Sequence, residues 1–245
     1  GTTGTADAST LDGLKLVVKE RVAPVITIVS PSSGAYVANS KQPVVFTVTD
    51  EANGSGVDLA TLVVKQDGTA VASSATKSTA VTNGYQVTYT PAQALTDGSH
   101  TITIDCKDHD GNAAEQKTTT YTVDTVPPTL NVTQPTDGLI TSSGTLTVAG
   151  TTNDATSSPV TITIQLNGAD QGAVTVGTGG AWSKQGTLAE GSNTIKVTAT
   201  DAAGKQSTVT RTVTLDTSVP QIKSATITPN PADAGATMVI SVTIE

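Results

Sequence analysis

The side chains of this sequence that could do chemistry are carboxylates, and the chemistry they suggest is calcium binding. Calcium takes six to eight oxygen ligands from carboxylates, carbonyls and water. Many acidic residues stand beside predicted turns, where Asp is also favoured because it bonds its own backbone. Ordinary turn chemistry is therefore the alternative interpretation. The candidate calcium ligands fall into two groups, Glu20, Asp50, Asp108 and Asp110, followed by Asp124, Asp154 and Asp201.

Catalysis requires titratable groups that converge on one place, and the sequence contains no recognisable set of this kind. The two histidines are His100, at a predicted strand start, and His109, in a predicted turn. Neither stands in a recognisable arrangement with a Ser or Cys nucleophile. We interpret both as polar surface residues and predict that the protein is not an enzyme.

Two further side chains each allow two interpretations. Cys106 has no second cysteine to pair with, so we expect a small buried apolar residue rather than a reactive thiol. Trp182 could offer a platform for a sugar ring. Glycan sites usually gather several aromatic rings, and an isolated Trp is more typical of a core anchor. We therefore favour the core for Trp182 and keep the glycan site as the alternative.

Composition excludes several classes of partner. The net charge is −8, whereas nucleic acid and anionic membrane surfaces require a basic face. No apolar run approaches the length that spans a bilayer. We therefore expect neither nucleic-acid binding nor membrane insertion.

The apolar residues alternate as they do in half-buried strands. In "VVFTVTD" (44–50) and "TITIDCKD" (101–108), every second residue is apolar and is predicted to face inward. "VTITIQL" (160–166) repeats the pattern. Many short strands, with turn signals between them and no amphipathic helix, indicate an all-β sandwich or barrel.

Similar stretches predict that the chain is built from repeats. "VDTVPPT" (123–129), "LDTSVPQ" (215–221) and the weaker "KERVAPV" (19–25) each place an acid four residues before a Pro, and "DGSHTITIDCKDHDGN" (97–112) matches "EGSNTIKVTATDAAGK" (190–205). A Pro removes a hydrogen-bond donor, so it can end one sheet and start the next. The predicted segments are an N-terminal strand or linker over 1–21, domains over 22–124 and 125–217, and over 218–245 either the two-strand start of a third unit or an oligomerisation segment.

"DTVPP" at the joint, "TDEANGSGVD" (49–58) and "LAEGSNTIKVTATDAAGK" (188–205) resemble the bacterial immunoglobulin-like (Big) domains. The resemblance covers residues 24–217 and implies tandem immunoglobulin-like antiparallel β-sandwiches. In such a sandwich the chain entry, the loop after the second strand and the last hairpin lie at one end. The resemblance therefore implies that each group of candidate calcium ligands gathers there. "ITPNPADAGATMVISVTIE" (227–245) is similar to the ends of tail-associated proteins in phages of Gram-positive bacteria.

These features predict a non-catalytic structural or adhesive module, which acts as a spacer or interaction domain. We expect an extracellular location, on a bacterial cell surface or in a phage virion. The alternatives are a glycan-binding module and accessory domains of a larger secreted enzyme. We expect no cofactor other than possible calcium. The orphan strands predicted over 14–20, 221–227 and 237–245 are expected to pair with protein partners or with a second copy of the chain, and surface glycans are a possible further ligand.

Overall fold

The structure is a computed structural model that describes residues 19–228, 234–235, 237 and 239–244. In these residues the secondary structure consists of β-strands and two short 3-10 turns, without an α-helix. The described part of the chain also lacks any helix with the length and hydrophobicity of a membrane span. The prediction of an all-β protein is confirmed.

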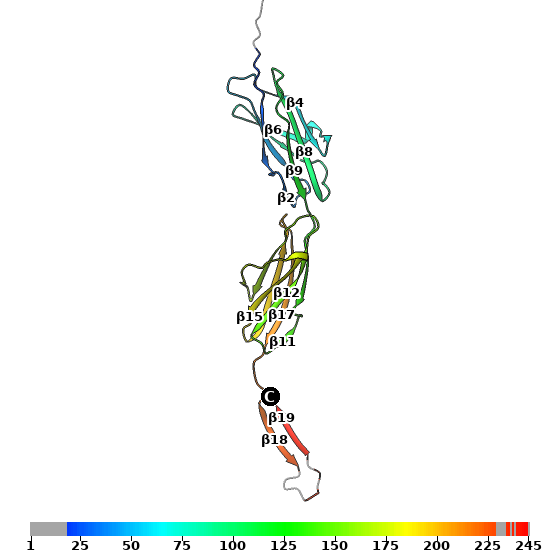
Figure 1. Ribbon diagram of the computed structural model, residues 1–245, viewed down its shortest axis with the longest axis vertical. Helices are drawn as coiled ribbons and strands as arrows, with labels where there is room; N and C mark the ends of the chain where they lie inside the picture. The colour runs from blue at the N-terminus through cyan, green and yellow to red at the C-terminus, as the bar shows by residue number, and fades with distance from the viewer. Residues whose placement is uncertain (1–18, 229–233, 236, 238, 245) are drawn as a thin grey trace, which may run out of the picture. The chain divides into compact units, whose positions relative to one another are not determined.

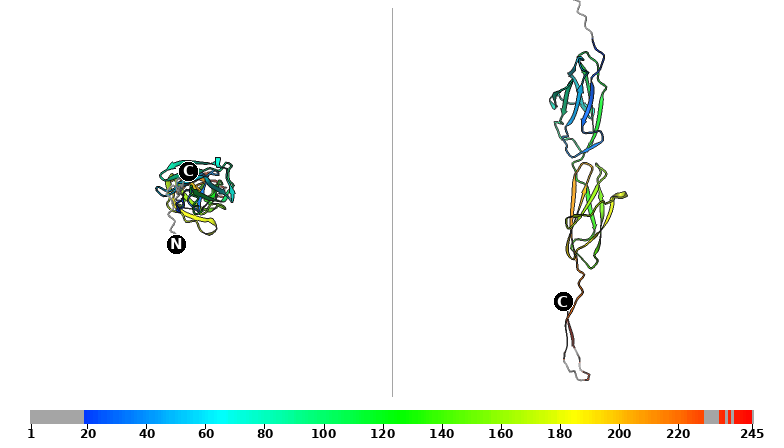
Figure 2. Two further views of the ribbon diagram at one scale, coloured as in Figure 1. Left: turned by 90° about the horizontal axis from the view of Figure 1, so that it is seen from above. Right: turned by 90° about the vertical axis from the view of Figure 1, so that its left-hand side faces the viewer.

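Contacts divide the chain into two compact units, with the division between Val126 and Pro127 and with residues 202–205 assigned to the first unit. The boundary predicted from sequence, between 124 and 125, lies two residues earlier. Within each unit the strands run roughly along one common direction, as the right-hand view of Figure 2 shows.

The first unit is a sandwich of two sheets (Figure 1). One sheet has four antiparallel strands in the order β1 (Val25–Ser30), β3 (Val44–Thr49), β7 (Gly84–Tyr89) and β6 (Thr76–Val81). The other sheet has five strands in the order β2 (Ala35–Val37), β9 (Lys117–Val123), β8 (Gly98–Asp108), β4 (Val57–Gln66) and β5 (Thr69–Ala70). In this second sheet β2 pairs with β9 in parallel, and the remaining pairs are antiparallel.

In the second unit, residues 127–217 form a sandwich that repeats this plan with one strand fewer. Its smaller sheet has the order β10 (Thr129–Gln134), β12 (Thr145–Asn153) and β15 (Ala181–Thr187). Its larger sheet has the order β11 (Leu139–Thr141), β17 (Gln206–Leu215), β16 (Gly191–Thr200), β13 (Thr161–Leu166) and β14 (Ala169–Asp170). Here β11 pairs with β17 in parallel. No strand of this sandwich, whose residues 127–217 are all described, corresponds to β6 of the first unit.

Each unit buries its own apolar core, and the predicted inward residues are the ones buried. Val44, Phe46 and Val48 on β3 are completely buried. The two cores fill one matching position differently. Phe46 faces Val87 across the β3–β7 pair, whereas Gly150 faces Trp182 across the β12–β15 pair. The large aromatic side chain of this pair therefore lies on β3 in the first sandwich and on β15 in the second. Gly150, opposite Trp182, leaves the space that the indole occupies.

Some strands differ from the sequence-based prediction. The strands β5 and β14 have only two residues each, too few for an alternating pattern, and an isolated bridge joins Val176 to Trp182. The short strands β2 and β11 and the polar strand β6 were not predicted. Three residues are too few to show a period of two, and five of the six residues of β6 are exposed.

Beyond the second sandwich, β18 (Ile222–Thr228) and β19 (Val239–Ile244) form a two-stranded antiparallel ribbon. Their register places Ile222 opposite Ile244, Ala225 opposite Val242 and Ile227 opposite Ile240, so one face is apolar. Five of these residues are exposed large apolar side chains, from 48% for Ile227 to 69% for Ile222. The expected pairing of this end with another chain stays a prediction. The strand predicted over 14–20 lies mostly outside the described residues.

Candidate functional site

Two segments of the first sandwich bring acidic side chains together near the chain entry. The first segment is the entry itself, which carries Glu20. The second is the loop that begins where β3 ends at Thr49, and it carries Asp50 and Glu51. Carboxylate oxygens of Glu20, Asp50 and Glu51 lie within 4.8 Å of one another. Glu20 and Asp50 were predicted to belong to such a site, whereas Glu51 was missed although it directly follows Asp50.

Backbone amides hold two of these carboxylates in place. Ser55 N donates to Glu20 Oε1 at 2.7 Å, and Gly56 N donates to Asp50 Oδ2 at 2.8 Å. Gly54 lies so close that a Cβ there would be 2.9 Å from oxygens of both Asp50 and Glu20. A side chain at residue 54 would therefore intrude between the acids, and glycine leaves this space open.

The cluster retains oxygens that no protein donor satisfies. Asp50 is 7% exposed, yet its Oδ1 has no hydrogen-bond partner, and neither has Oε2 of Glu51. A buried carboxylate oxygen without a partner is costly. The hydrogen bond to Glu20 raises the pKa of Glu51 to about 7, and Asp50 adds to this rise. The hydrogen bond with Glu51 is also the main cause that lowers the pKa of Glu20. The hydrogen bond from the Ser55 amide lowers this pKa further. Either a shared proton or a bound cation can relieve the repulsion among these acids.

The predicted ligands Asp108 and Asp110 lie beside this cluster but bond other groups. Asp108 accepts hydrogen bonds from Asn112 N and Asn112 Nδ2 at 2.8 and 2.6 Å. Burial alone would raise the pKa of Asp108, but these bonds lower it overall. Asp110 Oδ2 accepts from Glu20 N at 2.9 Å. Asp108 thus stabilises the turn of the β8–β9 hairpin. Asp110 links the entry segment to this hairpin by a hydrogen bond.

The second group of predicted ligands is divided between the two units. Asp124 follows β9 in the first unit, and its Oδ1 accepts from Val126 N at 3.0 Å. In the second unit, carboxylate oxygens of Asp154 and Asp201 lie within 4.8 Å of each other. Asp154 Oδ1 also accepts from Thr156 N and Ser157 N, as an Asp in a turn does. A calcium site shared by Asp124, Asp154 and Asp201 stays a prediction.

His100 is not the surface residue that the sequence indicated, because it is 7% exposed and lies within β8. Its Nδ1 contacts Asp67 Oδ2 at 2.8 Å, and its Nε2 contacts the carbonyl oxygen of Thr96 at 2.8 Å. Both ring nitrogens therefore have structural partners. Asp67 is 33 residues away in sequence, so a linear pattern could not reveal the pair. His109 is exposed in the turn after β8, as predicted.

The second sandwich builds the same contact from neutral amides. Asn167 Nδ2 donates to Asn193 Oδ1 at 2.9 Å, and Asn193 Nδ2 donates to the carbonyl oxygen of Ala189 at 2.7 Å. Asn167 and Asp67 are matched in the backbone, since each has a positive φ, of 52° and 49°, and each precedes a glycine. The two sandwiches thus carry a titratable and a non-titratable version of one structural link.

This difference predicts that only the first sandwich gains pH-dependent stability from the link. Burial would lower the pKa of His100, but Asp67 and the Thr96 carbonyl raise it overall. Its stabilisation is complete below the unfolded pKa of about 6.5 and is lost as the pH rises through the raised value. Burial would raise the pKa of Asp67, but His100 and the Thr101 amide lower it overall. Its contribution is therefore present above about pH 4.

The expected window of extra stability thus lies between about pH 4 and 6.5. Calorimetric melting of the full chain, compared with an Asp67→Asn/His100→Asn variant that copies the second sandwich, measures this effect. The difference is expected to stay below about 1 kcal/mol, because Asp67 is 44% exposed and its charge is screened. A difference between the two proteins that does not shrink above pH 7 would contradict this prediction.

Cys106 and Trp182 both lie in the cores, as the favoured interpretations predicted. Cys106 is 3% exposed, and burial raises the pKa of its thiol, which makes it a poor nucleophile. Trp182 is 4% exposed, so neither face of the indole is open to a sugar ring. This placement argues against the alternative interpretation of Trp182 as a glycan site.

The two sandwiches define the class of the protein as immunoglobulin-like in fold. Residues 30–125 match the family described as bacterial Ig-like domain, and residues 128–217 match the family described as glucodextranase, domain B. The chain is therefore a tandem immunoglobulin-like protein, and the resemblance to bacterial immunoglobulin-like domains inferred from its sequence is confirmed over residues 30–125. The resemblance of residues 227–245 to phage tail-associated proteins stays a prediction.

Fibronectin(III)-like modules of known structure show the same fold, and a second solved structure is similar to a lesser degree. The fibronectin(III)-like modules of CbhA from Clostridium thermocellum are 16% identical, with a TM-score of 0.50 over 78% of this chain and 94% of that chain. The immunoglobulin domains 1–5 of Sidekick-1 are also 16% identical, with a TM-score of 0.44 over 84% of this chain and 42% of that chain. A search of curated proteins finds no match.

Proposed function

We propose that the chain is a non-catalytic structural segment of a larger extracellular protein, and that calcium fixes the entry to its first sandwich. The observation that carries the calcium site is the buried Oδ1 of Asp50, which has no donor although it lies among acids. Hard oxygen ligands without His or Cys suit calcium. Glu20, Asp50 and Glu51 would bind the ion, and main-chain oxygens or water would complete its coordination.

Calcium at this place would give the segment a defined path into the sandwich. The entry is already held by Glu20, whose main-chain N bonds Asp110 and whose carbonyl oxygen accepts from Asn112 Nδ2. An ion between Glu20 and the 50–51 loop would add a strong, non-covalent link between the entry and the sandwich. Such a link suits a module that spaces or presents neighbouring parts, on a bacterial surface or in a virion. The exposed apolar face of the β18–β19 ribbon supports attachment to a further protein surface.

Melting of the full chain in millimolar calcium and in chelator tests the site. At a ligand concentration 100 times the dissociation constant, binding stabilises the native state by about 2.7 kcal/mol. For a domain of this size, each kcal/mol raises the Tm by about 4–8 °C. At that calcium concentration we therefore expect the first sandwich to melt about 10–20 °C higher, with no shift in the Asp50→Asn variant.

Asp105→Asn is the matched control, because Asp105 is a carboxylate of the same sandwich that bonds Gln116 outside the cluster. This variant should keep the full calcium shift. An equal Tm of the wild-type chain in calcium and in chelator would contradict the proposed calcium site. In chelator, the Asp50→Asn variant should also be more stable than the wild-type chain, because it lacks one of the charges that repel each other in the cluster.

The second candidate function is an accessory domain of a secreted carbohydrate-active enzyme. It is favoured by the match of residues 128–217 to domain B of glucodextranase. The gene and its neighbours discriminate between the two. A catalytic domain in the same reading frame would favour the accessory role, and adjacent tail or baseplate genes would favour the virion.

A further inference from the structure

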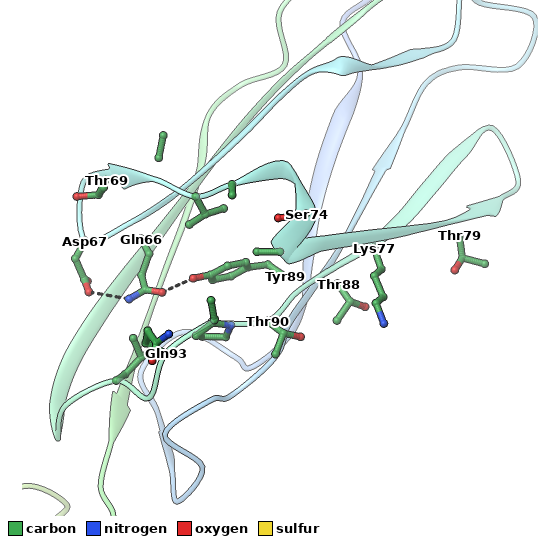
Figure 3. A pocket seen from close by; sticks show the side chains of 17 residues that line it. Gln66, Asp67, Thr69, Ser74, Lys77, Thr79, Thr88, Tyr89, Thr90 and Gln93 are labelled. Atoms are coloured by element: carbon green, nitrogen blue, oxygen red, sulfur yellow. Dashed lines mark hydrogen bonds between the residues drawn. The ribbon is translucent and has the colours of Figure 1, made fainter.

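One corner of the first sandwich is hollowed into an open groove of about 1080 Å³ (Figure 3). It lies between the edge strands β5 and β6, and the loop after β7 also lines it. The matching corner of the second sandwich, lined by Asn167 and Gln185, holds a depression of only about 370 Å³. The groove therefore belongs to the part of the first sandwich that differs from the second.

The strand that walls the groove contributes almost nothing to the core. β6 pairs with β7 on one side only, and five of its six residues are exposed. Ordering a strand costs conformational entropy, which burial of apolar side chains normally offsets. β6 lacks that compensation, and its Lys77 and Thr79 line the groove instead. This points to a role for the strand at the surface.

The lining of the groove is mixed polar and apolar, and it is nearly uncharged. Hydroxyl and amide side chains are mixed with small apolar ones in about equal numbers, and Asp67 and Lys77 are the only charged residues among those that line it. Small apolar groups, including Val71 and Leu95, lie between them. This mixture suits a ligand that alternates hydroxyl groups with C–H surfaces. It does not suit a polyanion, which needs a basic lining, or a purely apolar ligand.

Several polar groups are held in position before any ligand arrives. Tyr89 donates its hydroxyl hydrogen to Gln66 Oε1, and Figure 3 shows the Tyr89 hydroxyl directed at Gln66. Asp67 Oδ1 accepts from Thr101 N at 2.8 Å, and Asp67 Oδ2 contacts His100. The Asp67 side chain remains 44% exposed. Fixed acceptors and amides lower the entropic cost of binding.

We propose that this groove binds a neutral saccharide chain, with Gln66 and Asp67 as hydrogen-bonding partners of its hydroxyl groups. The site is distinct from Trp182 and does not depend on the calcium cluster. Tyr89 is 3% exposed, so its ring offers no stacking face. Because the groove offers no aromatic ring for stacking, we expect weak binding, with a dissociation constant of about 1 mM. This affinity is about three orders of magnitude lower than that of a micromolar site.

Amide chemical shifts of the full, isotope-labelled chain test the proposal, with maltohexaose, cellohexaose and chitohexaose as probes. At least one saccharide should shift amides within residues 66–79 and 88–95. Gln66→Ala should weaken binding by about tenfold, the effect of losing one hydrogen bond. Asp67→Asn should also weaken it while keeping the turn, because asparagine occupies the same turn in the second sandwich. Having two variants guards against a folding defect in either one.

Gln185→Ala is the control in the smaller depression of the second sandwich, and it should leave binding unchanged. Absence of shifts with all three saccharides up to their solubility limits would overturn the proposal. So would shifts that persist unchanged in both groove variants. A Thr/Val-rich hexapeptide serves as a competing probe for the free edge of β6. Shifts with the peptide and none with the saccharides would assign the groove to strand pairing instead. None of these outcomes changes the calcium-dependent melting.

Discussion

Replacing Trp182 with alanine is expected to destabilise the second sandwich by about 3–5 kcal/mol and to leave the first sandwich unchanged. The indole is 4% exposed within the core of the second unit. Its removal loses a large apolar surface and leaves a cavity beside Gly150, which has no side chain to fill it.

Scanning calorimetry of the full chain measures this effect, because the two cores contain different residues and should unfold in separate transitions. Trp182→Phe should cost less than Trp182→Ala, since a ring remains. Phe46→Ala is the matched variant in the first core and should shift only the other transition. A single transition that moves equally in both alanine variants would show that the sandwiches do not unfold independently.

Gly150→Ala is expected to destabilise the second sandwich by about 1–3 kcal/mol or more, through overpacking. An added Cβ would lie 2.1 Å from the carbonyl oxygen of Asn131 and 2.6 Å from Cζ2 of Trp182. The first contact is with backbone of the paired strand β10, so it cannot be relieved by a change of rotamer.

Urea denaturation compares this variant with Gly144→Ala, which is the control because a Cβ at residue 144 meets nothing within 4 Å. Combining Gly150→Ala with Trp182→Phe should relieve only the ring contact. The double variant therefore stays well below the stability of Trp182→Phe alone. Full recovery to that level would show that the Asn131 carbonyl does not restrict residue 150.

The alternating pattern of Val44, Phe46 and Val48 predicted the fold because burial on one face imposes a period of two on the sequence. The repeats predicted two similar units because each copy carries the alternating apolar residues of a core of its own. β6 escaped prediction because its polar residues face solvent on both sides. β2 escaped because its three residues are defined by pairing with β9, which is far away in the chain.

The candidate calcium site could be predicted only in part. Glu20 and Asp50 stand at the ends of predicted strands, so the expected sandwich brought them together. Glu51 lies one residue further along the loop, and only the path of that loop decides which way its side chain points. The adjacent acids in "TDEANG" were the available signal. The Asp67–His100 pair had no such signal, because its members meet through the pairing of β4 with β8.

The parallel pairs β2–β9 and β11–β17 have a mechanical consequence. In each sandwich, a strand near the beginning of the unit lies beside the last strand, and both run in the same direction. A pull on the two ends of the chain therefore slides these strands past each other in opposite directions. Their hydrogen bonds are loaded together in shear rather than opened one at a time. Resistance to force is governed by the rate of unfolding rather than by equilibrium stability, so three-residue strands that add little to the core can set the load at which each sandwich yields.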